Sequence, residues 1–170
     1  MSSSRLPRKV MSKLSGEPMI KRIYDLVNKC DYVDKVIVAT SLEKTDDELF
    51  EYCKSNKLNV YRGSLNNVLS RFVDIIKKYN PKLIVRITGD CPFVYPVFID
   101  KQIKILLQTG AVYIISKKEV KILCGQSVHS SSSLLFVAEN SSCADDLEHV
   151  GSPFLIRNHG KFKVVGIEIP

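Results

Sequence analysis

Hydrophobic and polar positions along the chain alternate between two patterns, one typical of strands and one typical of helices. Four short runs rich in β-branched residues predict buried strands, and they are Lys35–Ser41, Leu58–Arg62, Lys82–Thr88 and Ala111–Ser116. Four longer segments with apolar residues at helical spacing predict helices, and they cover residues 18–30, 45–55, 64–79 and 96–108. Because strands and helices alternate, we expect an α/β fold whose mainly parallel sheet is covered by helices on both faces.

Local signals indicate where two of these helices begin. Thr45 and Glu48 have the spacing of a capping box, which predicts a helix start at Thr45. Ser64 can cap the helix over 64–79, because a serine hydroxyl accepts a hydrogen bond from the backbone of the first turn. The apolar stripe of that helix consists of Leu65, Val68, Leu69, Phe72 and Ile76.

The last third of the chain has a less regular pattern. The expected elements are strands near Val120–Leu123 and Lys163–Ile169 and helices near Ser133–Glu139 and Asp145–Asn158. The serine run at Ser130–Ser133 predicts a turn followed by a helix cap. No internal repeat or linker interrupts the pattern, so we expect residues 1–170 to form one domain.

Composition excludes several classes of protein. Charged residues interrupt every apolar run well before the roughly 18–20 residues that a membrane-spanning helix needs. The basic N-terminal stretch is followed by no continuous apolar segment, so it is not a secretory signal. The five cysteines are widely spaced without a Cys-x-x-Cys pair, which argues against a disulfide framework and against a thiolate zinc site. We therefore expect a cytoplasmic protein with no membrane partner.

The formal charge of +7 predicts polyanionic partners. Several basic residues lie in short loops after predicted strands, which favours a phosphorylated small molecule over a nucleic-acid backbone. A single-strand nucleic-acid site would also place aromatic side chains among the basic ones, and Tyr61 is the one aromatic residue near Arg62. We expect no nucleic-acid partner. A dehydrogenase is excluded because no Gly-x-Gly-x-x-Gly follows a predicted strand.

Candidate chemistry lies before the first helix and after the strands, because ligands of parallel sheets bind beyond the carboxyl ends of the strands. In the segment from Ser2 to Lys9, small hydroxyl residues permit close backbone approach and the basic side chains can neutralise a triphosphate. The alternative is a disordered basic N-terminus. Asp90, next to Gly89, is placed to hold Mg²⁺ against phosphate oxygens, and the alternative is a plain Asp-Cys-Pro turn.

Two arginines follow the second predicted strand. Arg62 leaves that strand, and Arg71 lies two turns into the following helix. The alternative interpretation of Arg71 is an ordinary surface charge, which is the commonest role of an arginine on a helix.

Together these segments resemble a known family. SSRLPRK, GEPMIKRI, VIVATS, YRGSLNNVLSRF and VRITGDCPFV, in this order, are similar to cytidylyltransferases of the spore-coat polysaccharide type, which are related to CMP-sialic acid and CMP-Kdo synthetases. The ending LEHVGSPFLIRNHGKFKVVGIE resembles the Glu-His-Val-Thr-Pro-x-x-x-Arg region of that family. The resemblance covers nearly the whole chain. It implies a three-layer α/β/α, Rossmann-like nucleotide-diphospho-sugar transferase fold.

The resemblance also implies an activity. A sugar acceptor, nonulosonic-acid-like or a related surface-polysaccharide sugar, attacks the α-phosphate of CTP, and pyrophosphate leaves. Such chemistry depends on positioning and charge neutralisation, with Mg²⁺ as the cofactor. Members of the family often pair through the C-terminal region, so a homodimer is one expected assembly.

By carry-over from the family, the residues fall into four groups. The catalytic residues would be Arg5, Lys9 and Asp90. The nucleotide-binding residues would be Ser3, Ser4, Arg5, Lys9, Ser41, Arg62, Arg71 and Arg86. Asp90 would be the metal ligand. The sugar-binding candidates are Ser127, Glu148 and His149.

The sequence departs from the family pattern at several points. The family's strand ending in Gln-Ala-Arg has no counterpart before Ser2, and neither does its C-terminal segment after Pro170. Arg8 stands where the family has glycine. Ser127 stands where the family has an aspartate that resembles a second metal contact. A non-catalytic nucleotide-binding remnant or fragment of such an enzyme is therefore the alternative function.

Two histidines carry open alternatives. His149, beside Glu148, would contact the sugar or act as a base, and the alternative is a structural role. His129 would be a compensating metal ligand, but Mg²⁺ prefers oxygen, and we favour an ordinary strand residue.

Overall fold

The computed structural model describes residues 8–116 and 126–167 of the 170-residue chain. Its α-helices are α1 (Met19–Val27), α2 (Asp47–Ser55), α3 (Val68–Tyr79), α4 (Pro96–Thr109), α5 (Ser131–Asn140), α6 (Ala144–Glu148) and α7 (Ser152–Arg157). Its strands are β1 (Lys13–Leu14), β2 (Glu17–Pro18), β3 (Val38–Ser41), β4 (Val60–Gly63), β5 (Leu83–Ile87), β6 (Tyr113–Ser116), β7 (Gln126–Ser130) and β8 (Val164–Ile167). Two 3-10 turns, Lys9–Met11 and Lys44–Asp46, precede α1 and α2.

The strands form three sheets in the described part of the chain. β1 and β2 make a short antiparallel hairpin, and β3 and β4 pair in parallel. The largest sheet has the order β5-β7-β6-β8. β7 is antiparallel to both β5 and β6, and β8 is parallel to β6, so β5, β6 and β8 all run in one direction. The sheet is therefore mixed: three strands run in one direction, and the reversed strand β7 makes two of the three pairings antiparallel.

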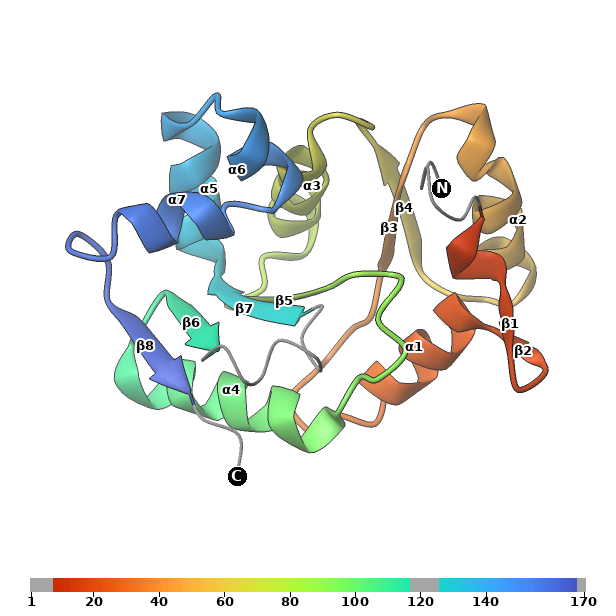
Figure 1. The fold of residues 1–170 in the computed structure, drawn as a ribbon, viewed down its shortest axis with the longest axis horizontal. Helices are drawn as coiled ribbons and strands as arrows, with labels where there is room; N and C mark the ends of the chain where they lie inside the picture. The colour runs from red at the N-terminus through yellow and green to blue at the C-terminus, as the bar shows by residue number, and fades with distance from the viewer. Residues whose placement is uncertain (1–7, 117–125, 168–170) are drawn as a thin grey trace.

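Helices cover both faces of the four-stranded sheet (Figure 1). On one face, α1 and α4 pack against β6, β7 and β8 around buried residues such as Ile99, Ile114 and Val128. On the other face, α3, α5 and α7 pack against β5 and β6 around Leu69 and Leu134. A third cluster, which includes Leu49 and Cys53 of α2, packs beside β3 and β4. The expected three-layer α/β/α arrangement is confirmed.

Strand β7 is an element that the sequence pattern did not predict. Its sequence, QSVHS, contains one aliphatic residue, yet its first four residues are buried. Gln126 donates a 2.8 Å hydrogen bond to Gln102 of α4, and Ser127 and His129 bond to one another, so the buried polar side chains have partners inside the protein. The strand predicted at Val120–Leu123 lies outside the described residues.

Two predicted helix starts are wrong, and one predicted helix is divided. Helix α2 begins at Asp47 rather than at the Thr45 capping box. Helix α3 begins at Val68 and is capped by Asn67, whose side chain accepts from the Ser70 backbone at 2.9 Å. The helix predicted over 145–158 is two short helices, because the chain turns through left-handed conformations at Val150 and Gly151.

The predicted cap in the serine run is confirmed. The Ser130 side chain accepts a hydrogen bond from the Ser133 backbone at 3.1 Å, and α5 begins directly after it. Within residues 8–116 and 126–167, no helix is both long enough and apolar enough to cross a bilayer.

Candidate functional site

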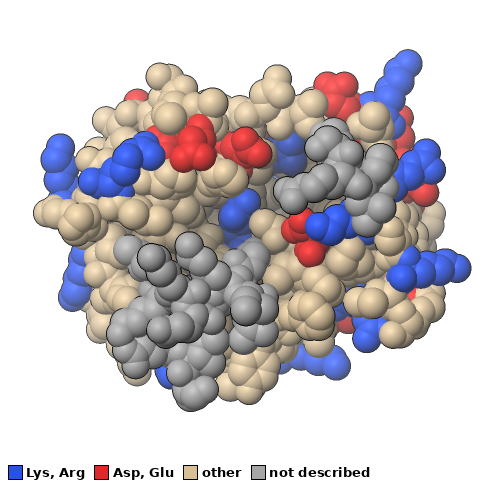
Figure 2. Space-filling model, viewed as in Figure 1, with Lys and Arg blue, Asp and Glu red and all other residues tan. Residues whose placement is uncertain are grey.

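The candidate site is built from loops that follow strands β3, β4 and β5. The β3 loop leads into the 3-10 turn and α2, the β4 loop leads into α3, and the β5 loop leads into α4. β3 and β4 are parallel and adjacent, so their loops leave the same edge of the sheet. Basic and acidic side chains both lie near the middle of the molecular face shown in Figure 2.

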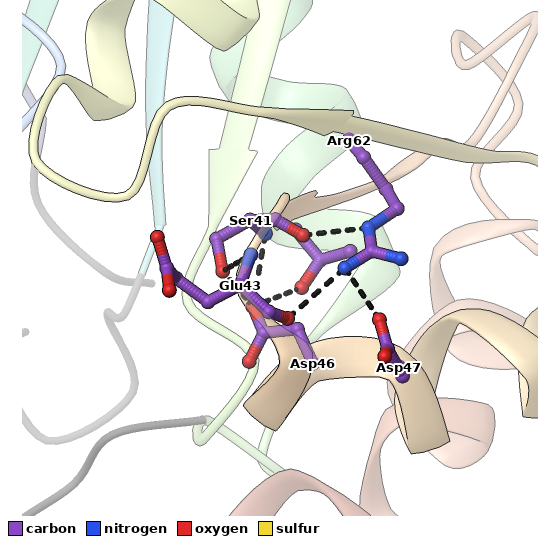
Figure 3. A network of polar contacts seen from close by, with 6 residues as sticks. Ser41, Glu43, Asp46, Asp47 and Arg62 are labelled. Atoms are coloured by element: carbon purple, nitrogen blue, oxygen red, sulfur yellow. Dashed lines mark hydrogen bonds and ion pairs between the residues drawn. The ribbon is translucent and has the colours of Figure 1, made fainter.

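Ser41, at the end of β3, is fully buried and held by Asp46 (Figure 3). The Asp46 carboxylate accepts from the Ser41 backbone N–H at 2.9 Å and from the Ser41 hydroxyl at 2.6 Å. It also accepts from the Thr40 hydroxyl at 2.6 Å. Burial alone would raise the pKa of Asp46, but hydrogen bonds to its carboxylate, those from Ser41 and Thr40 among them, outweigh it and lower the pKa below its usual range. Ser41 therefore holds the shape of its loop through this carboxylate.

Arg62 connects the β4 strand to the same loop (Figure 3). Its guanidinium donates to the backbone oxygens of Ser41 at 2.8 Å and Glu43 at 3.0 Å. It also forms a 2.7 Å ion pair with Asp47 and lies over the Phe50 ring, 5.1 Å from the centroid. The planar fork of arginine suits this kind of multiple contact. In this structure the guanidinium fastens the β3 loop to the start of α2.

Arg71 is buried, so the alternative of a surface charge is wrong. Its guanidinium donates to the backbone oxygens of Ser64 at 2.6 Å, Leu65 at 3.2 Å and Ala39 at 3.4 Å. Burial lowers the pKa of Arg71, and the neighbouring Asp46 carboxylate acts to raise it. Arg71 thus ties the β4 loop to strand β3. Sequence reasoning placed Ser41, Arg62 and Arg71 in one region, and the structure brings them together.

Lys9 and Asp90 meet although 81 positions separate them in the sequence. Lys9 Nζ lies 2.8 Å from Asp90 Oδ2, and the hydrogen bond from Lys9 lowers the pKa of Asp90. Gly89 allows this approach, because a Cβ there would lie 3.1 Å from the Val10 side chain. The segment before α1 therefore packs on the loop after β5. Two predicted catalytic residues lie side by side.

Arg8 adopts a left-handed backbone conformation, with φ of 59°. Glycine reaches this region without strain, whereas other residues pay about 1–2 kcal/mol. The Arg8 side chain points to Glu48 of α2, 3.2 Å away, and both side chains are largely exposed. The conformation gives a physical reason for a glycine at this position in the family that the sequence resembles.

We expect Arg8→Gly to raise the free energy of unfolding by about 0.5–1 kcal/mol. Relief of the left-handed strain outweighs the lost pair with Glu48, because exposed ion pairs contribute little. Urea denaturation of the two proteins measures the difference. Glu48→Gln, which breaks the same pair and leaves the backbone strain, is the control and should change stability by less than about 0.5 kcal/mol. A loss of stability in Arg8→Gly would contradict the expectation.

Arg86 and Ser127 lie opposite one another on the adjacent strands β5 and β7. Burial lowers the pKa of Arg86, while Tyr113, Asp90 and Glu148 act to raise it. Ser127 is buried and lies 2.8 Å from His129 Nε2. A hydroxyl engaged in this way, with no charge of its own, is a poor metal ligand.

His129 is a fully buried strand residue, as favoured from the sequence. Its ring lies 4.8 Å from the Tyr113 ring, and its Nδ1 has no hydrogen-bond partner among residues 8–116 and 126–167. Burial, and then the positive charge of Arg86, lower the pKa of His129 to about 3. The imidazole is therefore neutral at physiological pH.

Glu148 and His149 are exposed at the end of α6. His149 Nε2 lies 3.4 Å from Asp145 on the same helix. Glu148 is near enough to Arg86 to act on its pKa, which connects α6 to the β5 side of the site. The predicted residues Ser3, Ser4 and Arg5 lie outside the described part of the chain.

The described residues contain no group of three or more His, Cys, Asp or Glu side chains arranged to hold a metal ion. Asp90 is the single carboxylate that the sequence assigned to Mg²⁺. One carboxylate fits this metal only where substrate phosphates and water supply the other oxygen ligands, which is a common arrangement for Mg²⁺.

A separate hollow of about 370 Å³ lies between α3 and α5. It is lined by Asn67, Leu69, Ser70, Val73, Asp74, Lys77, Leu135, Ala138, Glu139 and Leu147. None of the predicted site residues lines it, and neither Lys9 nor Asp90 is among its lining residues. We therefore place the candidate site at the strand ends and not in this hollow.

Sequence reasoning missed Asp46, which organises the nucleotide-side loops. The sequence pattern assigned the segment from Thr45 to Glu48 to a helix cap, and that explanation accounted for the acidic residues there. The available signal was an Asp in the loop directly after a buried strand and before a helix, since an aspartate side chain there commonly bonds to nearby backbone N–H groups.

Comparison with known proteins matches this chain to one family along its length. The family model described as cytidylyltransferase matches residues 1–169. An uncharacterized protein of Methanocaldococcus jannaschii is 35% identical over 168 residues, which cover 99% of this chain and 68% of that protein. The spore coat polysaccharide biosynthesis protein SpsF of Bacillus subtilis is 32% identical, over 100% of this chain and 72% of that protein.

Solved structures agree with the sequence matches. A cytidylyltransferase from Leptospira borgpetersenii superposes with a TM-score of 0.89 at 26% identity, over 99% of this chain and 72% of that chain. A CMP:2-keto-3-deoxy-manno-octonic acid synthetase complexed with CTP shares the fold, with a TM-score of 0.77 at 14% identity, over 99% and 86% of the two chains. The match to the family model over nearly every residue, together with these relatives, shows that the chain belongs to the cytidylyltransferase family.

Proposed function

We propose that this protein transfers CMP from CTP to a sugar acceptor and releases pyrophosphate. The observation that carries the proposal is the contact of Lys9 with Asp90, at 2.8 Å, in a family whose model covers residues 1–169. The Lys9 ammonium and the Asp90 carboxylate are in contact, and Arg62 and Arg71 hold the loops after β3 and β4 in shape. A site with this charge arrangement suits a nucleoside triphosphate, since phosphoryl chemistry depends on neutralising charge and fixing geometry.

The residues would share the work as follows. Lys9 leaves Asp90 for the triphosphate and stabilises the negative charge that builds on the departing pyrophosphate. Asp90 holds Mg²⁺, which supplies Lewis-acid polarisation of the phosphate oxygens when it is bound. Arg62 and Arg71 would hold the loops that face the nucleotide in shape without touching the nucleotide, because their guanidinium groups bond to the backbone of these loops. Arg86, between the Asp90 and Glu148 sides, would contribute positive charge near the reacting groups.

The acceptor is proposed to be a nonulosonic-acid-like sugar or a related surface-polysaccharide sugar. Support comes from the names of two groups of relatives, the spore coat polysaccharide protein SpsF and the 3-deoxy-manno-octulosonate cytidylyltransferases. We further propose that the enzyme works in the cytoplasm, where CTP is made, and that it pairs as a homodimer.

A second candidate function is a nucleotide-binding protein without turnover. The observation that favours it is Ser127, which is buried, bonded to His129 and without the charge of a carboxylate. If the reaction requires a second carboxylate beside Asp90, this chain would bind CTP and not transfer it.

We expect Asp90→Ala to weaken CTP binding in the presence of Mg²⁺ by about 10- to 100-fold, because removal of a metal-holding carboxylate leaves the triphosphate charge less neutralised. Calorimetric titration measures the affinity, and Asp34→Ala, at an exposed aspartate in the loop before β3, is the matched control. Unchanged affinity in Asp90→Ala would contradict the placement of the nucleotide. Pyrophosphate release by the wild-type protein then separates the two functions: release supports the transferase, and tight CTP binding without release supports the non-catalytic alternative.

A further inference from the structure

Arg86, near the carboxyl end of β5, is a cation without a counter-ion in contact. Among residues 8–116 and 126–167, no oxygen accepts a hydrogen bond from its guanidinium, and no carboxylate lies within ion-pair distance. The side chain is partly buried, and burial lowers its pKa. An arginine keeps its charge in a protein, so burial without an acceptor costs free energy. The N–H donors of Arg86 are therefore available to a ligand that accepts hydrogen bonds.

The side chains next to Arg86 on this face of the sheet are neutral. Ser127 of β7 is its direct cross-strand neighbour, and His129 lies on the same face two positions along β7. Burial and the positive charge of Arg86 lower the pKa of His129 to about 3. The Tyr113 ring of β6 packs on the His129 ring with centroids 4.8 Å apart, and burial raises the pKa of Tyr113. None of these three side chains compensates the charge of Arg86 at physiological pH.

Ser127 and His129 are also engaged with one another. Ser127 Oγ lies 2.8 Å from His129 Nε2, and both residues are buried. The Ser152 hydroxyl of α7 lies 3.5 Å from the same nitrogen. A carboxylate at position 127 would face Arg86 directly, because opposite charges on cross-strand neighbours attract. The serine and the neutral histidine fill this space and leave the charge of Arg86 uncompensated.

The carboxylates farther away do not neutralise Arg86 either. Strand β5 leads from Arg86 into the loop that carries Asp90, and both Asp90 and Glu148 act to raise the pKa of Arg86. Asp90, however, is in contact with Lys9 at 2.8 Å. Glu148 is exposed, so water and salt weaken its attraction for the guanidinium. Arg86 is thus an uncompensated cation close to the Lys9–Asp90 contact.

We propose that Arg86 binds an oxyanion of a substrate or product, and that Ser127 and His129 are positioning residues that leave its charge uncompensated. The planar guanidinium can donate to two oxygens of one phosphate or carboxylate at the same time. The proposed reaction offers this chemistry in the phosphates of CTP and pyrophosphate and in the carboxylate of an acidic sugar acceptor. The inference rests on the proposed function, because that function supplies these anions.

Calorimetric titration without Mg²⁺ tests the oxyanion site with two probes, pyrophosphate and 3-deoxy-manno-octulosonate. We expect Arg86→Gln to weaken the binding of at least one probe by about tenfold or more, because charge-assisted hydrogen bonds are lost. Arg86→Lys keeps the charge without the planar fork and should restore part of the affinity. Weaker pyrophosphate binding identifies a phosphate as the anion, and weaker sugar binding identifies the carboxylate. Unchanged affinity for both probes, or a folded wild type that binds neither, would overturn the inference.

Ser127→Asp tests the positioning pair, because its carboxylate should neutralise Arg86 and weaken the same probe by about tenfold. Ser127→Asn has the same size without the charge and should weaken binding much less. Equal losses in the two variants would assign the effect to size and contradict the role of the pair. Stronger binding of CTP with Mg²⁺ in Ser127→Asp would instead make position 127 a defective metal ligand. A Ser127→Asp protein that does not fold would also contradict the pair, since Arg86 would then fail to compensate a carboxylate there.

Lys163→Gln is the control for a general loss of positive charge. Lys163 directly precedes β8, which runs in the same direction as β5, so it lies at the opposite edge of the sheet from the end of β5. Its ammonium donates to the Thr109 backbone oxygen at 2.6 Å. The variant should bind both probes as the wild type does, and a loss equal to that of Arg86→Gln would show a non-specific charge effect and refute the site.

The proposed function fails in a different way from this inference. A wild type that binds a probe through Arg86, but neither binds CTP nor releases pyrophosphate from it, would overturn the proposed function alone. A wild type that releases pyrophosphate from CTP, with probe affinities that Arg86→Gln leaves unaltered, would overturn this inference alone.

Discussion

Replacing Asp46 with alanine is expected to lower the free energy of unfolding by about 3 kcal/mol and to weaken CTP binding, because three hydrogen bonds to one buried carboxylate are lost. The hydroxyls of Thr40 and Ser41 and the Ser41 N–H would face a cavity without this partner. A loop that has lost its central acceptor would no longer hold the nucleotide-side groups in place. Urea denaturation measures the stability, and calorimetric titration measures the affinity.

Asp47→Ala is the matched control for this prediction. Asp47 is the neighbouring residue, carries the same charge and pairs with Arg62, but its side chain is 54% exposed. Because exposed ion pairs contribute at most about 1 kcal/mol, its loss should be small. Asp46→Asn should lose less stability than Asp46→Ala, since the three hydrogen bonds converge on Oδ2, whose place an amide oxygen can take without the charge. Equal and small effects at positions 46 and 47 would contradict the role given to Asp46.

The second large effect is a loss of stability in mild acid caused by His129. The unfolded chain binds a proton at this histidine near pH 6.5, whereas the folded protein resists protonation until about pH 3, because of burial and the positive charge of Arg86. Between these values the unfolded state binds more protons than the folded state, so stability falls as pH falls. The free energy of unfolding then falls by up to about 1.4 kcal/mol per pH unit, which amounts to about 2 kcal/mol between pH 6 and pH 4.5.

Denaturant titrations at several pH values test this. His129→Gln should flatten the pH dependence over that interval, whatever its effect on stability at pH 7. His159→Gln, which alters an exposed histidine, should retain the wild-type slope. At lower pH Asp46 also lowers the free energy of unfolding. Its pKa is depressed in the folded protein, so the stability that it contributes disappears as the carboxylate is protonated. Identical slopes in wild type and His129→Gln would contradict the account of a neutral buried imidazole.

Hydrophobic periodicity was sufficient to predict strands β3 to β6 and helices α1 to α4, but not the β1–β2 hairpin or the first residues of α2 and α3. The β-branched runs that became β3, β4, β5 and β6 bury aliphatic side chains between helices, and burial of this kind leaves a direct trace in the sequence. Strand β7 left no such trace, because Gln126, Ser127 and His129 are buried through hydrogen bonds to other side chains. Periodicity likewise gave no warning of the turn at Val150, where tertiary packing overrides the preference of valine.

In the candidate site, too, some features could be predicted from the sequence and others only from the structure. Sequence order and family resemblance brought Lys9 and Asp90 into one proposal, and the structure places their charged atoms in contact. The roles of Arg62 and Arg71 needed coordinates, since each bonds to backbone oxygens of loops and a sequence gives no sign of which loop an arginine reaches. Asp46 was missed for a related reason. A buried carboxylate that organises a loop is indistinguishable in sequence from a solvated one at a helix start.

Calorimetric titration of the wild-type protein with CTP, UTP, ATP and GTP in the presence of Mg²⁺ tests whether the protein has a cytidine nucleotide site. We predict that CTP binds, that its affinity exceeds those of the other three nucleotides, and that its affinity falls when Mg²⁺ is removed. Binding of none of the four by a folded sample, or equal binding of all four, would contradict a cytidylyltransferase site built on Lys9, Asp90 and the loops that Asp46 holds.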